Sequence, residues 1–177
     1  LLYGIALFIK TVSLSLQSKK KISVLPNSVY FHSLGSSNIP TSKDEYNIIT
    51  WFLNSPFSAK TKIIYHNVKC NEYEYKSKQV KSLPYDDLWK IDKAYFHNYL
   101  LWFILAFFTA SRDLIVGKWW NAFIFSEAVK YKTFELSKQN VNIKSHFFHW
   151  SGGNYRPLWT YLAEHKGAQI ICYFYSS

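Results

Sequence analysis

The sequence predicts an α/β fold in which a parallel β-sheet is flanked by helices. Segments with the apolar patterns of strands and of helices alternate along the chain, an order typical of parallel sheets. Residues 143–175 show this most clearly, as a strand, a turn, a helix and a second strand. With 177 residues, of which 49% are hydrophobic, the chain can build one domain core.

The first segment is expected to hold a helix and two short strands. Apolar residues at positions 2–16 are spaced as on one face of a helix, and three consecutive lysines at 19–21 would end it. β-Branched and aromatic residues at 22–25 and 29–34 predict strands around a Pro-Asn turn. Residues 1–21 therefore form an N-terminal helix that either packs on the domain or lies close to a membrane.

The next segment predicts a helix followed by a strand. Ser42 and Glu45 have the spacing of a capping box, which favours a helix start there, and Pro56 would end the helix. Residues 62–68 predict a strand. Residues 70–87 are polar and irregular in pattern, so we interpret them as a connecting segment whose structure the sequence does not indicate.

The last half predicts helices and then a βαβ unit. Residues 88–139 have helical apolar spacing and form a helical insertion of two helices. Strands are predicted at 143–150 and 168–175, and the helix between them ends at Gly167, because glycine terminates helices. We expect residues 22–177 to form one incomplete α/β domain.

The net charge of +10 comes almost entirely from lysine, because Arg112 and Arg156 are the only arginines. The lysines are scattered, whereas a nucleic-acid surface concentrates basic residues and uses arginine forks. The composition therefore argues against a nucleic-acid partner. A solvated surface accounts for the lysines, and attraction to an anionic membrane or a phosphorylated substrate is the alternative.

The two cysteines, Cys70 and Cys172, lie far apart in the sequence and form no CxxC motif. This spacing argues against a zinc site within the chain and fits a reducing, cytoplasmic compartment. The longest uninterrupted apolar run, 99–110, is shorter than the roughly 20 residues that span a bilayer. The chain has no methionine and its last apolar run nearly reaches Ser177, so we expect a piece of a larger protein.

Candidate site residues follow the predicted strands, because ligands of an open parallel sheet bind outside the carboxyl ends of its strands. His32, His66 and His149 are the candidates for catalysis, since imidazole exchanges protons near neutral pH and the three could converge. The alternative is an ordinary hydrogen-bonding role, which is the more frequent one for a lone histidine at a strand end. The substrate-binding candidates are Ser33, Asn67, Ser151, Gly152, Gly153, Arg156, Tyr175 and Ser176.

The Gly152-Gly153 turn precedes a predicted helix, so its free N–H groups could hold a phosphate or carboxylate together with Arg156. In the other interpretation the glycines only make a tight turn and Arg156 pairs with a surface acid. His146 and His149 are three residues apart on a strand and therefore lie on opposite faces. They cannot form a metal pair, and no pattern in the sequence requires a metal or cofactor.

Several strings of residues resemble the bacterial polysaccharide biosynthesis proteins named for a PFTS motif. The most specific are RPLWTY at 156–161 and YFYS at 173–176. GKWWNA at 117–122 and the shorter strings at 29–32 and 47–52 are similar as well, so the resemblance spans most of the chain. PFTS itself is absent, and PFSA at 56–59 is not its equivalent.

The resemblance implies a function in surface-carbohydrate synthesis. Proteins of this family are regarded as glycosyltransferases with two facing Rossmann-like halves, of the GT-B type. The chain would then be the Rossmann-like, acceptor-side half, with a nucleotide sugar bound mainly by a second half beyond Ser177. The resemblance also implies a glycan or lipid-linked acceptor and a location at the inner face of the bacterial plasma membrane. The alternative is a non-catalytic module that docks an assembly complex at the membrane through apolar helices and lysines.

Overall fold

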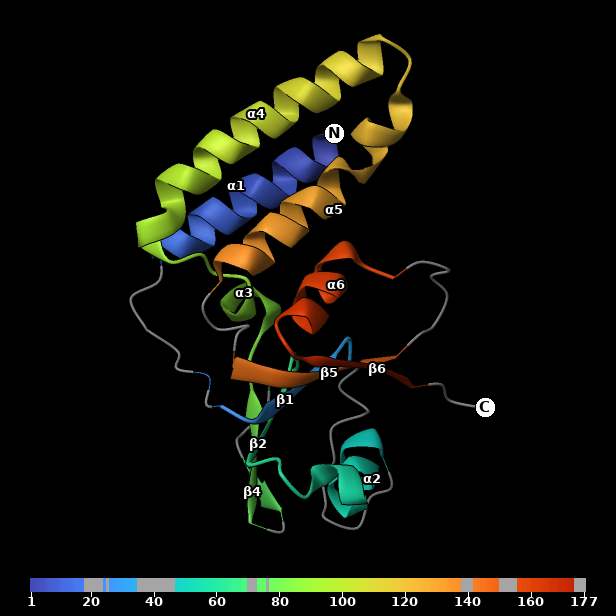
Figure 1. The fold of residues 1–177 in the computed structure, drawn as a ribbon. Helices are drawn as coiled ribbons and strands as arrows, with labels where there is room; N and C mark the ends of the chain where they lie inside the picture. The colour runs from blue at the N-terminus through green and yellow to red at the C-terminus, as the bar shows by residue number, and fades with distance from the viewer. Residues whose placement is uncertain are drawn as a thin grey trace. The chain divides into compact units, whose positions relative to one another are not determined.

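The computed structural model describes residues 1–17, 24, 26–34, 47–69, 73–75, 77–137, 142–149 and 156–173. The chain divides into two compact units, each assembled from three segments (Figure 1). The helical unit comprises Leu1–Ile22, Asp86–Asn140 and Tyr155–His165. The sheet unit comprises Ser23–Tyr85, Val141–Asn154 and Lys166–Ser177.

The sheet unit is built on a Rossmann-like parallel sheet, which confirms the predicted α/β class. Five of its described strands are parallel, and β3 pairs antiparallel with β4 at one edge. In spatial order the strands are β3 (Tyr73–Tyr75), β4 (Lys78–Ser82), β2 (Ile63–His66), β1 (Ser28–His32), β5 (Ile143–His149) and β6 (Gln169–Tyr173).

Helix α2 (Ile48–Asn54) covers one face of this sheet. Its N-terminus is fixed by Asn47, whose Oδ1 accepts a hydrogen bond from Thr50 N at 2.9 Å. The predicted start at Ser42 lies outside the described residues. A 3₁₀ turn, η2 (Pro56–Ser58), follows the helix as the proline predicted. The core between helix and sheet consists of Val29, Phe31, Leu34, Ile48, Ile49, Phe52, Leu53, Ile64, Val80 and Phe147.

The predicted strands at 29–34, 62–68, 143–150 and 168–175 are confirmed as β1, β2, β5 and β6. Gly167 follows α6 (Leu158–His165) with a φ of +84°, the left-handed conformation expected of a helix terminator. Of the strand predicted at 22–25 only Val24 is described, and it lies outside any strand.

The segment 70–87, for which the sequence pattern indicated no structure, contains the strand β4. This strand has the sequence KQVKS, and only Val80 carries an apolar side chain into the core. A strand near the sheet edge needs few apolar residues, since its backbone is satisfied by β2 on one side and β3 on the other. Its sequence pattern is therefore that of a loop.

In the helical unit, helices α4 (Phe96–Ile115) and α5 (Trp119–Leu136) form a hairpin, and α1 (Leu2–Gln17) lies beside it (Figure 1). The helix predicted from residue 88 begins only at Phe96, after the short helices α3 (Tyr85–Leu88) and η3 (Lys93–Tyr95). Aromatic rings join these helices, with Phe8 stacked on Phe103 at 3.7 Å between centroids.

Within the described residues, no helix has both the length and the apolarity needed to span a membrane.

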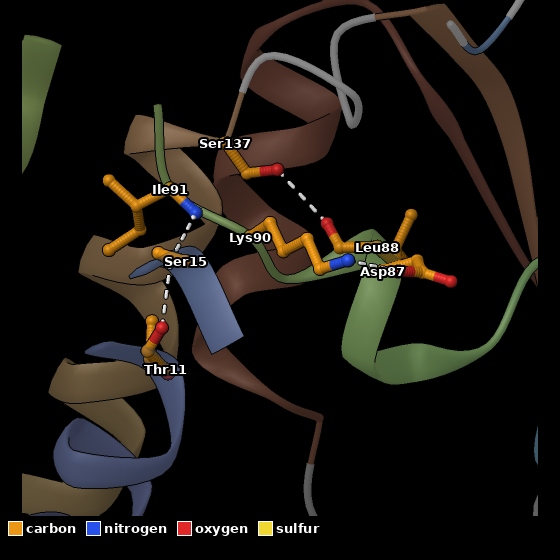
Figure 2. A network of polar contacts seen from close by, with 7 residues as sticks. All are labelled: Thr11, Ser15, Asp87, Leu88, Lys90, Ile91 and Ser137. Atoms are coloured by element: carbon orange, nitrogen blue, oxygen red, sulfur yellow. Dashed lines mark hydrogen bonds and ion pairs between the residues drawn. The ribbon is translucent and has the colours of Figure 1, made fainter. Parts of the chain in front are cut away.

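Buried hydroxyl groups attach residues 87–91 to the helices of this unit (Figure 2). Ser15 Oγ donates to Thr11 O at 2.7 Å and accepts from Ile91 N at 3.1 Å. Ser137 Oγ donates to Leu88 O at 2.9 Å, and Lys90 forms an ion pair with Asp87. Through these bonds the two hydroxyls satisfy backbone groups of Leu88 and Ile91, which anchors this short segment to the helices.

Gly4 allows α1 to approach α5 closely, so we expect Gly4→Ala to destabilise the protein. An added Cβ would lie 2.7 Å from Cε1 of the buried Phe125 ring and closer still to its Cδ1. Overpacking costs about 1–3 kcal/mol, which exceeds the roughly 1 kcal/mol that alanine gains in helix propensity. Urea unfolding at neutral pH would measure the loss.

The matched test is Gly4→Ala in a Phe125→Leu background. The smaller side chain leaves room for the methyl group, so the penalty should shrink or change sign, and a double-mutant cycle would report the coupling. A Gly4→Ala variant that is as stable as the parent chain would contradict this account of the helix contact.

Candidate functional site

The candidate site lies at the carboxyl edge of the parallel sheet, where β1, β2, β4 and β5 all end. Strand order runs β4-β2-β1 in one direction and β5-β6 in the other, so the order reverses between β1 and β5. In open α/β sheets this reversal leaves a crevice outside the strand ends, and ligands bind there. The residues at the ends of β1 and β5 are therefore the first to consider.

Two buried histidines meet across this boundary. His32 Nε2 and His146 Nδ1 lie 3.0 Å apart, and the side chains are 2% and 0% exposed. Burial, followed by the neighbouring His146, lowers the pKa of His32 well below 6.5, and burial lowers the pKa of His146 to about 3. Both rings are thus neutral near pH 7, with one nitrogen donating and the other accepting.

Aromatic rings hold this histidine pair in place. Phe148, the register partner of His32, stacks on the His32 ring with 4.2 Å between centroids, and the Tyr85 ring lies 5.8 Å away. His32 is therefore confined between neighbours and has little contact with solvent. Its Nε2 can share a proton with His146, but its 2% exposure leaves the ring almost no surface for direct contact with a ligand.

Two hydroxyl groups of the site lie nearer the surface, on the exposed Ser33 after β1 and on the half-buried Tyr85 after β4. Ser33 has a φ of +56°, and its N–H donates to the Tyr85 hydroxyl at 2.6 Å while the two hydroxyl oxygens lie 3.2 Å apart. Burial raises the pKa of Tyr85, and the hydrogen bonds with Ser33 oppose part of that rise. Ser33 and Tyr85 thus form a fixed pair of hydroxyl groups at the strand end.

Asn67 supports the same segment from the end of β2. Its Oδ1 accepts from Leu34 N at 2.9 Å and its Nδ2 donates to Leu34 O at 3.1 Å. The side-chain amide thus replaces a missing strand partner for Leu34, and it explains how the sequence fixes the chain beyond β1. The predicted residues His32, Ser33 and Asn67 are all part of this carboxyl edge.

His66 does not join His32. In the β1–β2 register His66 pairs with Phe31, and side chains of neighbouring residues on a strand point to opposite faces. His66 therefore shares the α2 face, where burial lowers its pKa to about 4, whereas His32 lies on the other face. The predicted convergence of His32 and His66 is not found. The third candidate, His149, is the last residue of β5, where its register partner is Tyr173 of β6.

Arg156 belongs to the helical unit, where it makes local contacts. Its Nη2 pairs with Glu164 Oε2 at 2.6 Å and its Nε donates to Thr160 Oγ1 at 2.7 Å. The guanidinium group also lies 4.2 Å from the Tyr161 ring centroid. The pairing of Arg156 with Glu164 agrees with the second of the two interpretations of the sequence, in which Arg156 pairs with a surface acid. Ser151, Gly152, Gly153, Tyr175 and Ser176 lie outside the described residues.

Comparisons with protein-family models, curated proteins and solved structures find no match to this chain. Among the described residues, no group of three or more His, Cys, Asp or Glu side chains is placed to hold a metal ion.

Sequence reasoning missed Tyr85 and gave His146 no role. Tyr85 lies three residues after the end of β4, so recognising β4 as a strand would have placed the Tyr85 hydroxyl near the carboxyl edge. His146 lies mid-strand, and only the β1–β5 register brings it to His32. Together the described residues provide hydroxyl and amide groups at the surface and a neutral histidine pair behind them.

Proposed function

We propose that this chain is the acceptor-side half of a nucleotide-sugar-dependent glycosyltransferase of bacterial surface polysaccharide synthesis, of the O-antigen or capsule type. The acceptor would be a glycan or a lipid-linked glycan at the inner face of the plasma membrane. The donor sugar would be held mainly by a second α/β half. The PFTS-motif resemblance supplies this family assignment, and the site supplies the binding chemistry.

The observation that carries the proposal is the polar carboxyl edge of a Rossmann-like sheet whose parallel strands lie in the order β4-β2-β1-β5-β6. Ser33 and Tyr85 place two hydroxyl groups 3.2 Å apart, next to the point where the strand order reverses. Paired hydroxyl groups both donate and accept hydrogen bonds, which suits a sugar because its hydroxyl groups do the same. The edge is thus chemically matched to a carbohydrate.

Catalysis in this proposal relies mainly on positioning. The Ser33 and Tyr85 hydroxyls would orient an acceptor hydroxyl toward the donor, and fixed donors of hydrogen bonds would stabilise charge on the departing diphosphate. The His32–His146 pair, buried behind these hydroxyls, would keep the end of β1 in place. His66, on the α2 face, would have a structural role.

Hydrogen exchange measured by mass spectrometry tests the binding site. We expect short glycans linked to a prenyl diphosphate to protect the amides of residues 33, 34, 83 and 85, and nucleotide sugars to protect them less. Tyr85→Phe should weaken glycan binding by about threefold to tenfold, the equivalent of one hydrogen bond. Tyr131→Phe, at an exposed tyrosine of α5, is the matched control and should leave binding unchanged.

If neither the glycans nor the nucleotide sugars protect these amides, the proposal fails. Equal loss of binding in the two tyrosine variants would also count against it, since the hydroxyl at the sheet edge would then have no special role.

A non-catalytic docking module remains the second candidate, and the exposed apolar side chains of α4 and α5 favour it. The two candidates differ in the complete polypeptide. An enzyme requires a second α/β half that binds the nucleotide sugar, and transfer of a radiolabelled sugar to the glycan would be measurable.

A further inference from the structure

The tip of the α4–α5 hairpin exposes large apolar side chains that no described residue covers. We define the hairpin tip as residues 101–124. Outward-facing residues of α4 recur at intervals of three and four, so they form a single stripe along the helix. The exposed apolar side chains of the tip are Leu101, Ile104, Leu105, Phe108, Leu114, Ile115, Val116, Trp119, Trp120, Phe123 and Ile124.

The exposure of these side chains is large. Ile115 is 85% exposed and Phe123 is 79% exposed, and both tryptophans are at least half exposed. Apolar surface of this extent is uncommon on a free monomer and marks a surface that contacts another phase or molecule.

The exposed charge at the tip is basic. Residues 101–124 contain three charged side chains, Arg112, Asp113 and Lys118. Asp113 is buried, and its carboxylate accepts hydrogen bonds from Asn121 and Arg112. Arg112, which pairs with Asp113, and Lys118 are both exposed, so an approaching surface meets a net positive charge beside apolar side chains.

The hairpin tip is also preformed. Backbone bonds close the turn, with Lys118 N donating to Asp113 O at 2.7 Å and Val116 N to Arg112 O at 3.1 Å. Gly117 takes a φ of +84°, which the turn requires. Since the turn needs no further ordering, binding through it would carry a small conformational cost.

We propose that the hairpin tip inserts into the surface of an anionic lipid bilayer. Tryptophan is favoured at the boundary between headgroups and acyl chains, and basic side chains beside it contact anionic headgroups. The chain's net charge of +10 adds a long-range attraction to such a surface. A protein groove is a poorer match, because it would have to enclose apolar side chains on both helices of a projecting turn. This inference is independent of glycosyl transfer.

Vesicle co-sedimentation of the 177-residue chain tests the proposal. We expect binding to vesicles that mix phosphatidylglycerol with phosphatidylcholine and at least tenfold weaker binding to phosphatidylcholine alone. Added salt should weaken the binding, because it screens the charge attraction. Brominated lipids should quench tryptophan fluorescence if Trp119 and Trp120 enter the bilayer.

Two variants locate the surface. A variant with Trp119→Ser, Trp120→Ser and Phe123→Ser should bind at least tenfold more weakly, and Lys118→Glu should reduce binding only to the anionic vesicles. The matched control removes an exposed Trp–Phe pair from the sheet unit, Trp51→Ser with Phe57→Ser, and should leave binding unchanged. Far-UV circular dichroism would verify that each variant is folded.

Three results would overturn the proposal. The first is equal binding to both kinds of vesicle, and the second is an equal loss of binding in the control pair. The third is a chain that does not bind vesicles and that light scattering shows to be a dimer, with the dimer lost in the Trp119→Ser, Trp120→Ser and Phe123→Ser variant. None of them depends on nucleotide-sugar or glycan binding, so failure here is distinguishable from failure of the proposed function.

Discussion

Acidification from pH 7 to pH 5 is expected to destabilise the sheet unit by several kcal/mol. Burial lowers the pKa of His66 to about 4 and of His146 to about 3, and the pKa of His32 lies well below 6.5. In the unfolded chain all three would take up protons near pH 6.5. The unfolded state therefore binds more protons between pH 6.5 and about 4, and acid favours it.

The size of this effect follows from proton linkage. Each histidine that is neutral in the fold and charged when unfolded costs up to about 1.4 kcal/mol per pH unit in that window. Three together approach about 4 kcal/mol per pH unit, against a total stability of about 5–15 kcal/mol for an ordinary domain. The contribution of the three neutral histidines to stability should be fully present above pH 6.5 and largely lost by pH 4 to 5.

Urea midpoints measured from pH 8 to pH 4.5 would follow this loss. His66→Gln lowers absolute stability but should reduce the slope by about a third, because one of the three titrating groups is gone. His97→Asn, at an exposed histidine of α4, controls for the removal of a histidine as such. A midpoint that stays constant from pH 7 to pH 5 would show that these rings are not held neutral in the fold.

Phe31→Ala is expected to cost about 3–5 kcal/mol, the range typical of deleting a buried aromatic ring. Phe31 is fully buried on the central strand β1, with its ring centroid 4.6 Å from that of Phe147 and 5.6 Å from that of Phe52. The cavity would therefore separate α2 from two strands at once.

Phe57→Ala is the matched control, because Phe57 belongs to the same unit but is 70% exposed. Its loss should change stability by less than about 0.5 kcal/mol. Hydrogen exchange of the β1 and β2 amides would report the difference within the sheet unit. Similar costs for the two substitutions would contradict the assignment of Phe31 to the core.

Strands with strongly apolar sequences could be predicted, and those held mainly by their backbone could not. The side chains of VYFH in β1 and of IIYH in β2 are all buried and mostly apolar or aromatic, so the sequence pattern alone identified these strands. β4 escaped because a single valine faces the core, and the missed strand concealed Tyr85. One error in the fold thus became an omission in the site.

The candidate site was predictable only to the level of strand ends. The rule for parallel sheets selects His32, Ser33 and Asn67, and all three lie at the carboxyl edge. It does not give the register between strands, and register decides that His32 meets His146 while His66 faces α2. Pairing is set by long-range packing, which local sequence patterns do not encode.

The contact between β1 and β5 has a kinetic consequence. The His32–His146 hydrogen bond joins residues 114 positions apart, and the intervening chain passes through the helical unit before returning to the sheet. Closing so long a loop costs entropy before any strand contact repays it, so the central pairing should form late and slowly. During synthesis, the edge of β1 that pairs with β5 stays unpaired until residues 143–149 have left the ribosome. A chaperone that shields that edge would therefore be expected to raise the yield of folded protein.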